Sequence, residues 1–259
     1  MFFVLEYNPN KNNNKNDDIV YELDETPNKK ETIIGLALGV GYLTFFAVIP
    51  MLILLAIFKQ GIDQDLLSTI AQIIAACFTI LMMAIVSKRV INAVMDGFNK
   101  ENLVKGLIYG LIMYGIAIAY GLIDQLIFGE AITNANQGQL YVIAKLSPAI
   151  FILFAVFAAP IVEELIFRYY LYKPLEKKGP VVAIIVSTLV FSLIHLIPSI
   201  ASNTFFVDLR TLPSYILPSL MFGIAYYRTK HIATTMIAHV IYNGITCFFI
   251  FMQISSGLI

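Results

Sequence analysis

Two carboxylates and a guanidinium directly follow an apolar run of the sequence. Glu163, Glu164 and Arg168 come after residues 146–162, where a membrane-spanning helix is predicted. A charged side chain in the hydrocarbon core costs roughly 3 kcal/mol on insertion scales, so it usually has a function or a partner. Residues four apart share a helix face, which lets Glu164 and Arg168 form a salt bridge. Glu163 is rotated by about 100° from Glu164, so we expect it to face a cavity as a general base or acid.

Three further polar residues lie in two later apolar runs. His195 lies in one, and His239 and Asn243 lie four residues apart in the other. Counted from the predicted span ends at about 1.5 Å per residue, all three and Glu163 fall in a band about two helical turns deep. His195 could share a water with Glu163. His239 and Asn243 could direct two donors at the oxyanion that forms during peptide-bond hydrolysis.

Two alternatives stay open for these residues. Each of them could simply hydrogen-bond one helix to the next, although their common depth favours an intramembrane active site. Glu163, His195 and His239 could also supply three ligands of a catalytic zinc, with water as the fourth. No second carboxylate is evident to orient either histidine, which favours a site without a metal or other cofactor. Pro160 is expected to begin a helix and to place both carboxylates near its positive N-terminus.

The composition indicates which elements position these residues. Of 259 residues, 59% are hydrophobic and 13% are charged, whereas a soluble protein carries about 25% charge. The chain is therefore predicted to be an all-α, polytopic transmembrane bundle of about seven to eight helices. A net charge of +0 gives no indication of a nucleic-acid partner. The predicted spans are Thr32–Phe58, Leu66–Ser87, Gly106–Ile123, Leu146–Tyr172, Gly179–Ile197, Thr211–Tyr227 and Ile232–Ile250.

The cationic residues predict an orientation in the cell membrane. With the N-terminus in the cytoplasm, the outer loops carry only Lys59, Lys145 and Arg210, as the positive-inside rule requires. Residues 1–31 are then a polar, disordered cytoplasmic tail. Residues 32–140 form N-terminal transmembrane helices, and residues 141–259 form the catalytic core.

Three motifs occur in order in this core. They read Glu-Glu-x-x-x-Arg at 163–168, Phe-x-x-x-His at 191–195 and His-x-x-x-Asn at 239–243. This arrangement resembles the CAAX-protease and bacteriocin-processing (Abi) family of intramembrane proteases over residues 151–249. That family typically has eight transmembrane helices. The missing one could arise if the chain breaks at Pro160, or from a short span in 129–146.

The resemblance implies a role for each motif residue. Glu163 and His195 would activate water, His239 and Asn243 would stabilise the oxyanion, and Glu164 with Arg168 would support the site. The family has been described both as metalloproteases and as metal-free glutamate proteases. Its substrates are prenylated CAAX proteins in eukaryotes, whereas bacterial relatives are linked to bacteriocin or pheromone peptides and to self-immunity.

Three functions follow from these observations. The first is an intramembrane endopeptidase that cuts a membrane-associated peptide or protein. The second is a non-proteolytic immunity or scaffold protein of the same fold. The third is a transporter with a proton-coupling carboxylate, which is disfavoured because no inverted repeat is visible between the two halves.

Overall fold

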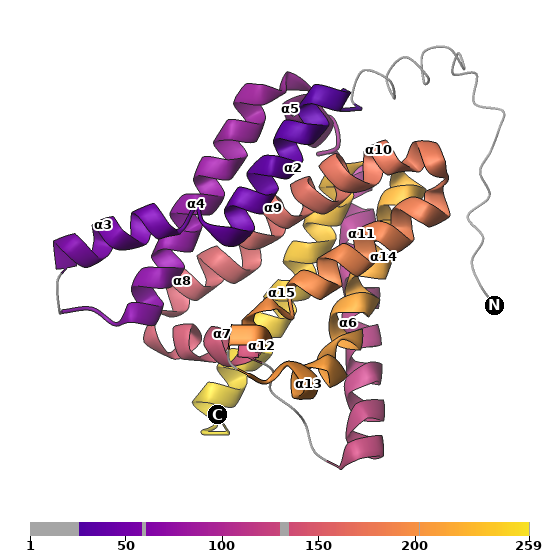
Figure 1. Ribbon diagram of the computed structural model, residues 1–259. Coiled ribbons are helices and arrows are strands. Elements are labelled where there is room, and N and C mark those ends of the chain that lie inside the picture. The colour runs from indigo at the N-terminus through magenta and orange to yellow at the C-terminus, as the bar shows by residue number, and fades with distance from the viewer. Residues whose placement is uncertain (1–25, 59–60, 130–134, 202, 259) are drawn as a thin grey trace.

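The computed structural model describes residues 26–58, 61–129, 135–201 and 203–258, and these residues are predominantly helical (Figure 1). The prediction of an all-α bundle is confirmed. In chain order the elements are α2 (Lys29–Thr44), α3 (Val48–Phe58), α4 (Gln64–Val86), α5 (Lys88–Met95), α6 (Lys100–Phe128), α7 (Ala135–Leu146), α8 (Pro148–Ile152), η1 (Leu153–Ala158), α9 (Ala159–Glu164), η2 (Leu165–Tyr172), α10 (Lys173–Leu175), η3 (Glu176–Lys178), α11 (Pro180–Ile194), α12 (Ile197–Ala201), α13 (Phe205–Asp208), η4 (Leu209–Thr211), α14 (Pro213–Thr229) and α15 (Ile232–Ser255).

Six helical segments are long and apolar enough to cross a membrane, so the protein is a multi-pass membrane protein. The seventh predicted span corresponds to α14, which has 17 residues and is shorter than the other six. The short α7, of 12 residues, occupies the stretch where a further short span was considered. The six segments are Lys29–Phe58, Gln64–Val86, Lys100–Phe128, Pro148–Lys178, Pro180–Ser199 and Ile232–Ser255.

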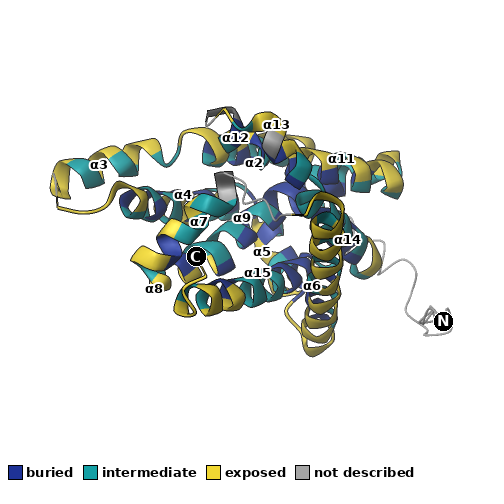
Figure 2. Ribbon diagram, turned by 90° about the horizontal axis from the view of Figure 1, so that it is seen from below, coloured by how far each residue is buried: buried dark blue, intermediate teal, exposed yellow. Residues whose placement is uncertain are grey.

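The segment Pro148–Lys178 forms the centre of the bundle. In its most apolar stretch 56% of the residues are buried inside the protein, against 6% for the first segment, Lys29–Phe58. Figure 2 shows exposed residues along the outer faces of α3 and α6 and buried residues toward the middle. The exposed side chains of these outer faces are largely aliphatic, as expected of surfaces that face lipid.

The central segment is one continuous helix with two π-helical stretches. The π-helices η1 and η2 flank α9, which carries both carboxylates. Pro160 therefore does not begin the helix but lies inside it, which corrects the expectation from the sequence. Proline lacks an N–H and its ring clashes with the carbonyl four residues earlier, and the wider π turns of η1 provide room for that ring. Consequently Glu163 and Glu164 lie within a helix rather than at its positive end.

Glycines allow two close helix contacts. A Cβ on Gly35 or Gly39 of α2 would lie 2.3 Å from the Tyr170 ring and 2.9 Å from Ile166 of η2, respectively. On α6, a Cβ at Gly106 would lie 2.7 Å from Ile237 of α15. Glycines four residues apart let membrane helices approach closely. Here they hold α2 against η2 and α6 against α15, which carries His239.

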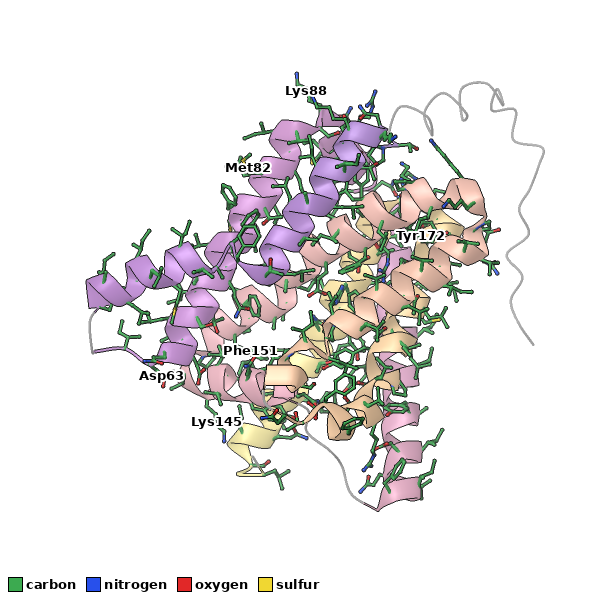
Figure 3. All side chains as sticks on the ribbon, in the orientation of Figure 1. Asp63, Met82, Lys88, Lys145, Phe151 and Tyr172 are labelled. Atoms are coloured by element: carbon green, nitrogen blue, oxygen red, sulfur yellow. The ribbon has the colours of Figure 1, made fainter. Side chains whose placement is uncertain are left out.

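The ends of the bundle separate the two predicted groups of cations. Lys88 lies at one end and Lys145 at the other (Figure 3). This separation agrees with the charge asymmetry used to orient the chain, and the side on which each end lies stays a prediction. Of the predicted polar tail, residues 1–25 lie outside the described residues. Its last residues are helical, because Asn28 and Glu31 form a reciprocal capping box at the start of α2.

Candidate active site

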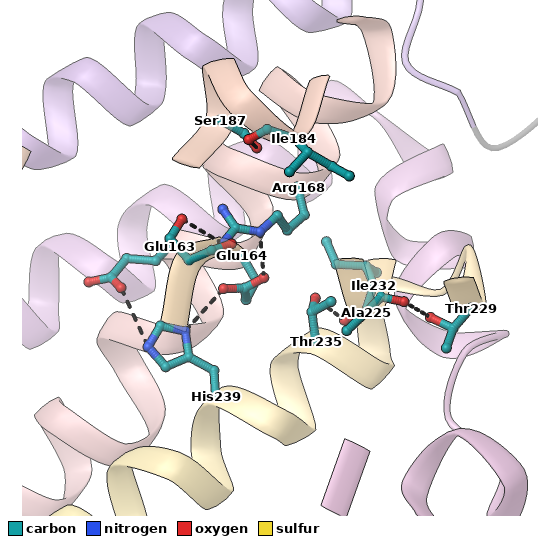
Figure 4. A network of polar contacts seen from close by, with 11 residues as sticks. Glu163, Glu164, Arg168, Ile184, Ser187, Ala225, Thr229, Ile232, Thr235 and His239 are labelled. Atoms are coloured by element: carbon teal, nitrogen blue, oxygen red, sulfur yellow. Dashed lines mark hydrogen bonds and ion pairs between the residues drawn. The ribbon is translucent and has the colours of Figure 1, made fainter. Parts of the chain in front are cut away.

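His239 of α15 lies between the two adjacent carboxylates of α9 (Figure 4). Its Nδ1 is 3.0 Å from Oε1 of Glu164, and its Nε2 is 3.8 Å from Oε2 of Glu163. A carboxylate can only accept, so Nδ1–H donates to Glu164. Nε2 is then the atom that His239 presents toward Glu163. The sequence analysis found no carboxylate placed to orient a histidine, and the structure corrects this, since Glu164 orients His239.

Arg168 fixes Glu164 from the other side. Its Nε lies 3.5 Å from Oε2 of Glu164, and both side chains are fully buried. The predicted salt bridge is confirmed. One terminal nitrogen of the guanidinium also donates to the carbonyl and the hydroxyl oxygen of Ser219, at 3.2 and 3.1 Å. The guanidinium faces the rings of Phe191 and Phe222, with 5.5 Å to each centroid. Arg168 therefore ties the carboxylate helix to α14.

His195 ends α11 and presents one ring nitrogen to the site. Its Nδ1 lies 2.7 Å from the carbonyl oxygen of Phe191. A carbonyl can only accept, so Nδ1 carries the hydrogen and Nε2 of the neutral ring carries a lone pair. The imidazole stacks on Tyr215 with 4.6 Å between centroids and 27° between planes. The ring orientation is thus held by a hydrogen bond and by an aromatic contact.

Asn243 lies one helical turn beyond His239 on α15. Its Nδ2 donates to the carbonyl oxygen of Ala155, at 2.7 Å. Ala155 belongs to η1, so this side chain links α15 to the π-helical stretch before the carboxylates. A carboxamide carries two N–H groups, and one of the two is used in this bond. The two donors that the sequence analysis directed at one place are therefore each partly engaged, His239 through Nδ1 and Asn243 through one N–H.

One cavity brings Glu163, His195, His239 and Asn243 together. This aromatic cavity has a volume of about 260 Å³. The apolar part of its wall is formed by Phe154, Phe191, Tyr215, Phe222 and Tyr242. Glu163 is exposed to it, since 16% of its side chain is accessible whereas that of Glu164 is fully buried. Glu163 therefore faces a cavity, as the sequence predicted.

A second cavity reaches the same two residues from the other side of α9. This amide cavity, named for its glutamines, has a volume of about 340 Å³ and also contains Glu163 and His195. Its polar wall is formed by Tyr42, Thr44, Gln72 and Gln139.

The three candidate zinc ligands are not gathered into a coordination set. No three His, Cys, Asp or Glu side chains of the described residues lie close enough to one another to hold an ion. His239 instead directs one nitrogen at each of the two carboxylates. The donors as placed do not fit a catalytic zinc, and no step below is routed through a metal.

The sequence analysis missed the residues of α14 and those of the N-terminal half. Tyr215 and Ser219 lie four residues apart in an otherwise apolar run, as a helix face with a polar function would require. Gln72 is likewise a carboxamide within a long apolar run. A polar side chain at such a position was the available signal in each case.

The chain is similar to known membrane proteases. Residues 145–245 match the family model described as type II CAAX prenyl endopeptidase Rce1-like, and all six candidate residues lie within this range. The membrane-embedded CAAX protease MroQ of Staphylococcus aureus (strain USA300) is 30% identical over 148 residues, 54% of this chain and 57% of MroQ. YdiL of Bacillus subtilis (strain 168), which carries the name of a membrane peptidase, is 27% identical over 195 residues, 74% of this chain and 72% of YdiL.

The chain thus covers less than two thirds of the length of the first of these relatives. No solved structure matches it. The resemblance that the three ordered motifs predicted is confirmed by the family model and by both relatives.

Proposed function

We propose that this protein, whose residues 145–245 match the Rce1-like CAAX protease family, is an endopeptidase that hydrolyses a peptide bond of a membrane-associated peptide or protein. One observation carries the proposal. Glu163, His195, His239 and Asn243 line a single cavity within the matched range. Its volume is close to the lower end of the roughly 300–1,000 Å³ of small-ligand sites, which suits a segment of an extended chain.

Water activation falls to Glu163 and His195. Nε2 of neutral His195 and the Glu163 carboxylate are both acceptors on one cavity, so a water between them donates one hydrogen to each. The water oxygen attacks the carbonyl carbon of the scissile bond while its proton passes to Glu163. When the C–N bond breaks, Glu163 returns that proton to the leaving amine. The carboxylate therefore ends the cycle in its starting state.

The oxyanion is placed on the opposite wall, at α15. Asn243 offers its second N–H to this oxygen. His239 can donate through Nε2 only when both of its nitrogens are protonated, since its Nδ1–H already bonds Glu164. Glu164 and Arg168 have a positioning role, because they hold His239 and α9 and do not line the cavity. An oxyanion donor of this kind contributes about 10²–10³ in kcat.

The substrate class is a peptide or protein at the cytoplasmic side of the membrane, with the N-terminus of this chain on that side. Bacteriocin or pheromone precursors and CAAX-like proteins are the candidates that the resemblance implies. The orientation rests on the asymmetry of the cationic residues.

The test compares newly formed peptide termini in membranes that contain native protein, Glu163→Gln or Glu101→Gln at matched levels. Glu101 is a surface residue whose side chain is 75% exposed, so its variant controls for the substitution itself. Termini that appear with the native protein and with Glu101→Gln, and are lost in Glu163→Gln, support proteolysis. Identical profiles for all three proteins in the native host would reject it in favour of a binding or immunity function.

A further inference from the structure

The N-terminal helices complete the wall around Glu163. In Figure 1, α2 and α4 lie on one side of α9, and α11 and α14 lie on the other. The amide cavity lies on the first side, where Tyr42 and Thr44 come from α2, Gln72 from α4 and Gln139 from α7. These four residues lie outside residues 145–245, the range that matches the family model. This part of the cavity wall is therefore supplied by helices outside the matched domain.

The chemistry of this wall fits an uncharged peptide backbone. A carboxamide both donates and accepts hydrogen bonds, as do the hydroxyls of tyrosine and threonine. Of the described residues that line this cavity, Glu163 is the one carboxylate, and none is a lysine or an arginine. A peptide at membrane depth needs a partner for every N–H and C=O, because an unpaired backbone group there costs several kcal/mol. Two glutamines can bond such groups through both their N–H and their oxygen.

The side chains of both glutamines are accessible to a ligand. Gln72 is half-buried and makes a long bond of 3.4 Å from Nε2 to Ser68 of its own helix, which leaves its oxygen and its second N–H for other partners. Gln139 is exposed. Both residues belong to long helices of the described chain, so the bundle holds their backbones in place.

The two cavities meet at the residues that are proposed to activate water. Glu163 and His195 line both cavities, as do Phe154 and Ala159. An extended chain whose scissile carbonyl lies at Glu163 therefore has its two sides in different surroundings. One side faces carboxamides and hydroxyls, and the other faces aromatic rings.

We propose that the amide cavity is a substrate subsite. In it Gln72 and Gln139 bond the backbone of an extended peptide on one side of the scissile bond, while the aromatic cavity holds an apolar side chain on the other side. The subsite selects uncharged residues at the positions that it contacts. This inference rests on the proposed endopeptidase function.

The experiment uses the purified full chain in lipid nanodiscs with a degenerate synthetic peptide library. New termini are identified by mass spectrometry, and kcat/KM is then measured on the best peptide. We expect Gln72→Leu and Gln139→Leu each to lower kcat/KM about tenfold or more, mainly through KM, because a bound backbone group loses its partner. Gln125→Leu on α6 is the matched control, because Gln125 is exposed in a membrane helix and does not line either cavity.

A charge change separates recognition from a structural effect. Gln72→Glu is expected to cleave peptides with a lysine at the contacted position better than the native protein does. It should cleave the uncharged peptide less well. A subsite that contacts the peptide predicts this reversal, and a loss of folding does not.

The outcomes distinguish the two proposals. If the native protein and Glu163→Gln release the same termini, the endopeptidase function fails and the subsite with it. If the native protein cleaves, and both glutamine-to-leucine variants match Gln125→Leu without a reversal in Gln72→Glu, the subsite alone is overturned.

Discussion

Replacing Arg168 with methionine tests whether the Glu164 pair supports the structure. The methionine keeps an apolar side chain at a fully buried position but removes the charge that faces Glu164 at 3.5 Å. It also removes both hydrogen bonds to Ser219. Breaking a buried ion pair from one side costs roughly 3–5 kcal/mol, because the remaining charge has no compensation.

The structure sets this cost near the lower end of that range. Glu164 keeps a second partner, since Nδ1–H of His239 donates to it at 3.0 Å. We therefore expect Arg168→Met to lower the free energy of unfolding by about 3 kcal/mol. This corresponds to roughly a 10²-fold change in the unfolding equilibrium constant.

The control is Arg89→Met. Arg89 pairs with Glu31 at 2.9 Å, but 37% of its side chain is exposed. A pair of this kind contributes only about 0–1 kcal/mol. Unfolding is followed by circular dichroism as SDS is added to protein in mixed micelles. In the double variant Glu164→Gln/Arg168→Met the uncompensated charge is gone, so its loss should be smaller than the sum of the two single losses.

The reasoning is refuted by either of two results. One is a loss in Arg168→Met no larger than that in Arg89→Met. The other is strict additivity in the double variant, which would mean that the two buried side chains do not interact.

Two further predictions concern the helix contact and the oxyanion wall. A Cβ at Gly110 of α6 would lie 2.8 Å from the carbonyl oxygen of Ala238, so Gly110→Ala should cost about 1–3 kcal/mol in the same SDS titration. Gly115→Ala, where no atom lies within 4 Å, should instead be neutral or stabilise by up to about 1 kcal/mol, and equal effects would contradict the contact. Asn243→Ala should slow peptide turnover by about 10²–10³. Thr246→Ala, which lines the same cavity but bonds only its own helix among the printed contacts, should keep near-native turnover, and a native rate in Asn243→Ala would argue against the oxyanion role.

Local spacing was sufficient to predict some of the site. The pairing of Glu164 with Arg168 depends only on residues four apart in one helix, so it could be read from the sequence. The convergence of His195 and His239 on Glu163 also could be predicted, because helices that cross one membrane place residues of equal depth side by side. The family motifs agree with that geometry.

Contacts that depend on helix rotation could not be predicted in this way. The bond from His239 to Glu164 requires α15 to present a particular face to α9, which no spacing within either helix specifies. Pro160 misled for a related reason, because a proline in a sequence does not reveal a π-helical stretch that accommodates it. The contribution of Gln72 depends on tertiary packing between distant parts of the chain.

The π-helical stretch before the carboxylates makes the number of residues there as important as their identity. A π turn closes its hydrogen bond one residue later than an α turn, so it holds an additional residue. Deleting one residue from η1, Leu153–Ala158, would let that stretch return to α-helical spacing. Everything after it would then turn by about 100° relative to the start of the helix. Glu163 would leave the cavity although the Glu-Glu-x-x-x-Arg motif and the apolar composition were unchanged, so a relative with a gap at this position would need a compensating insertion to keep the same site.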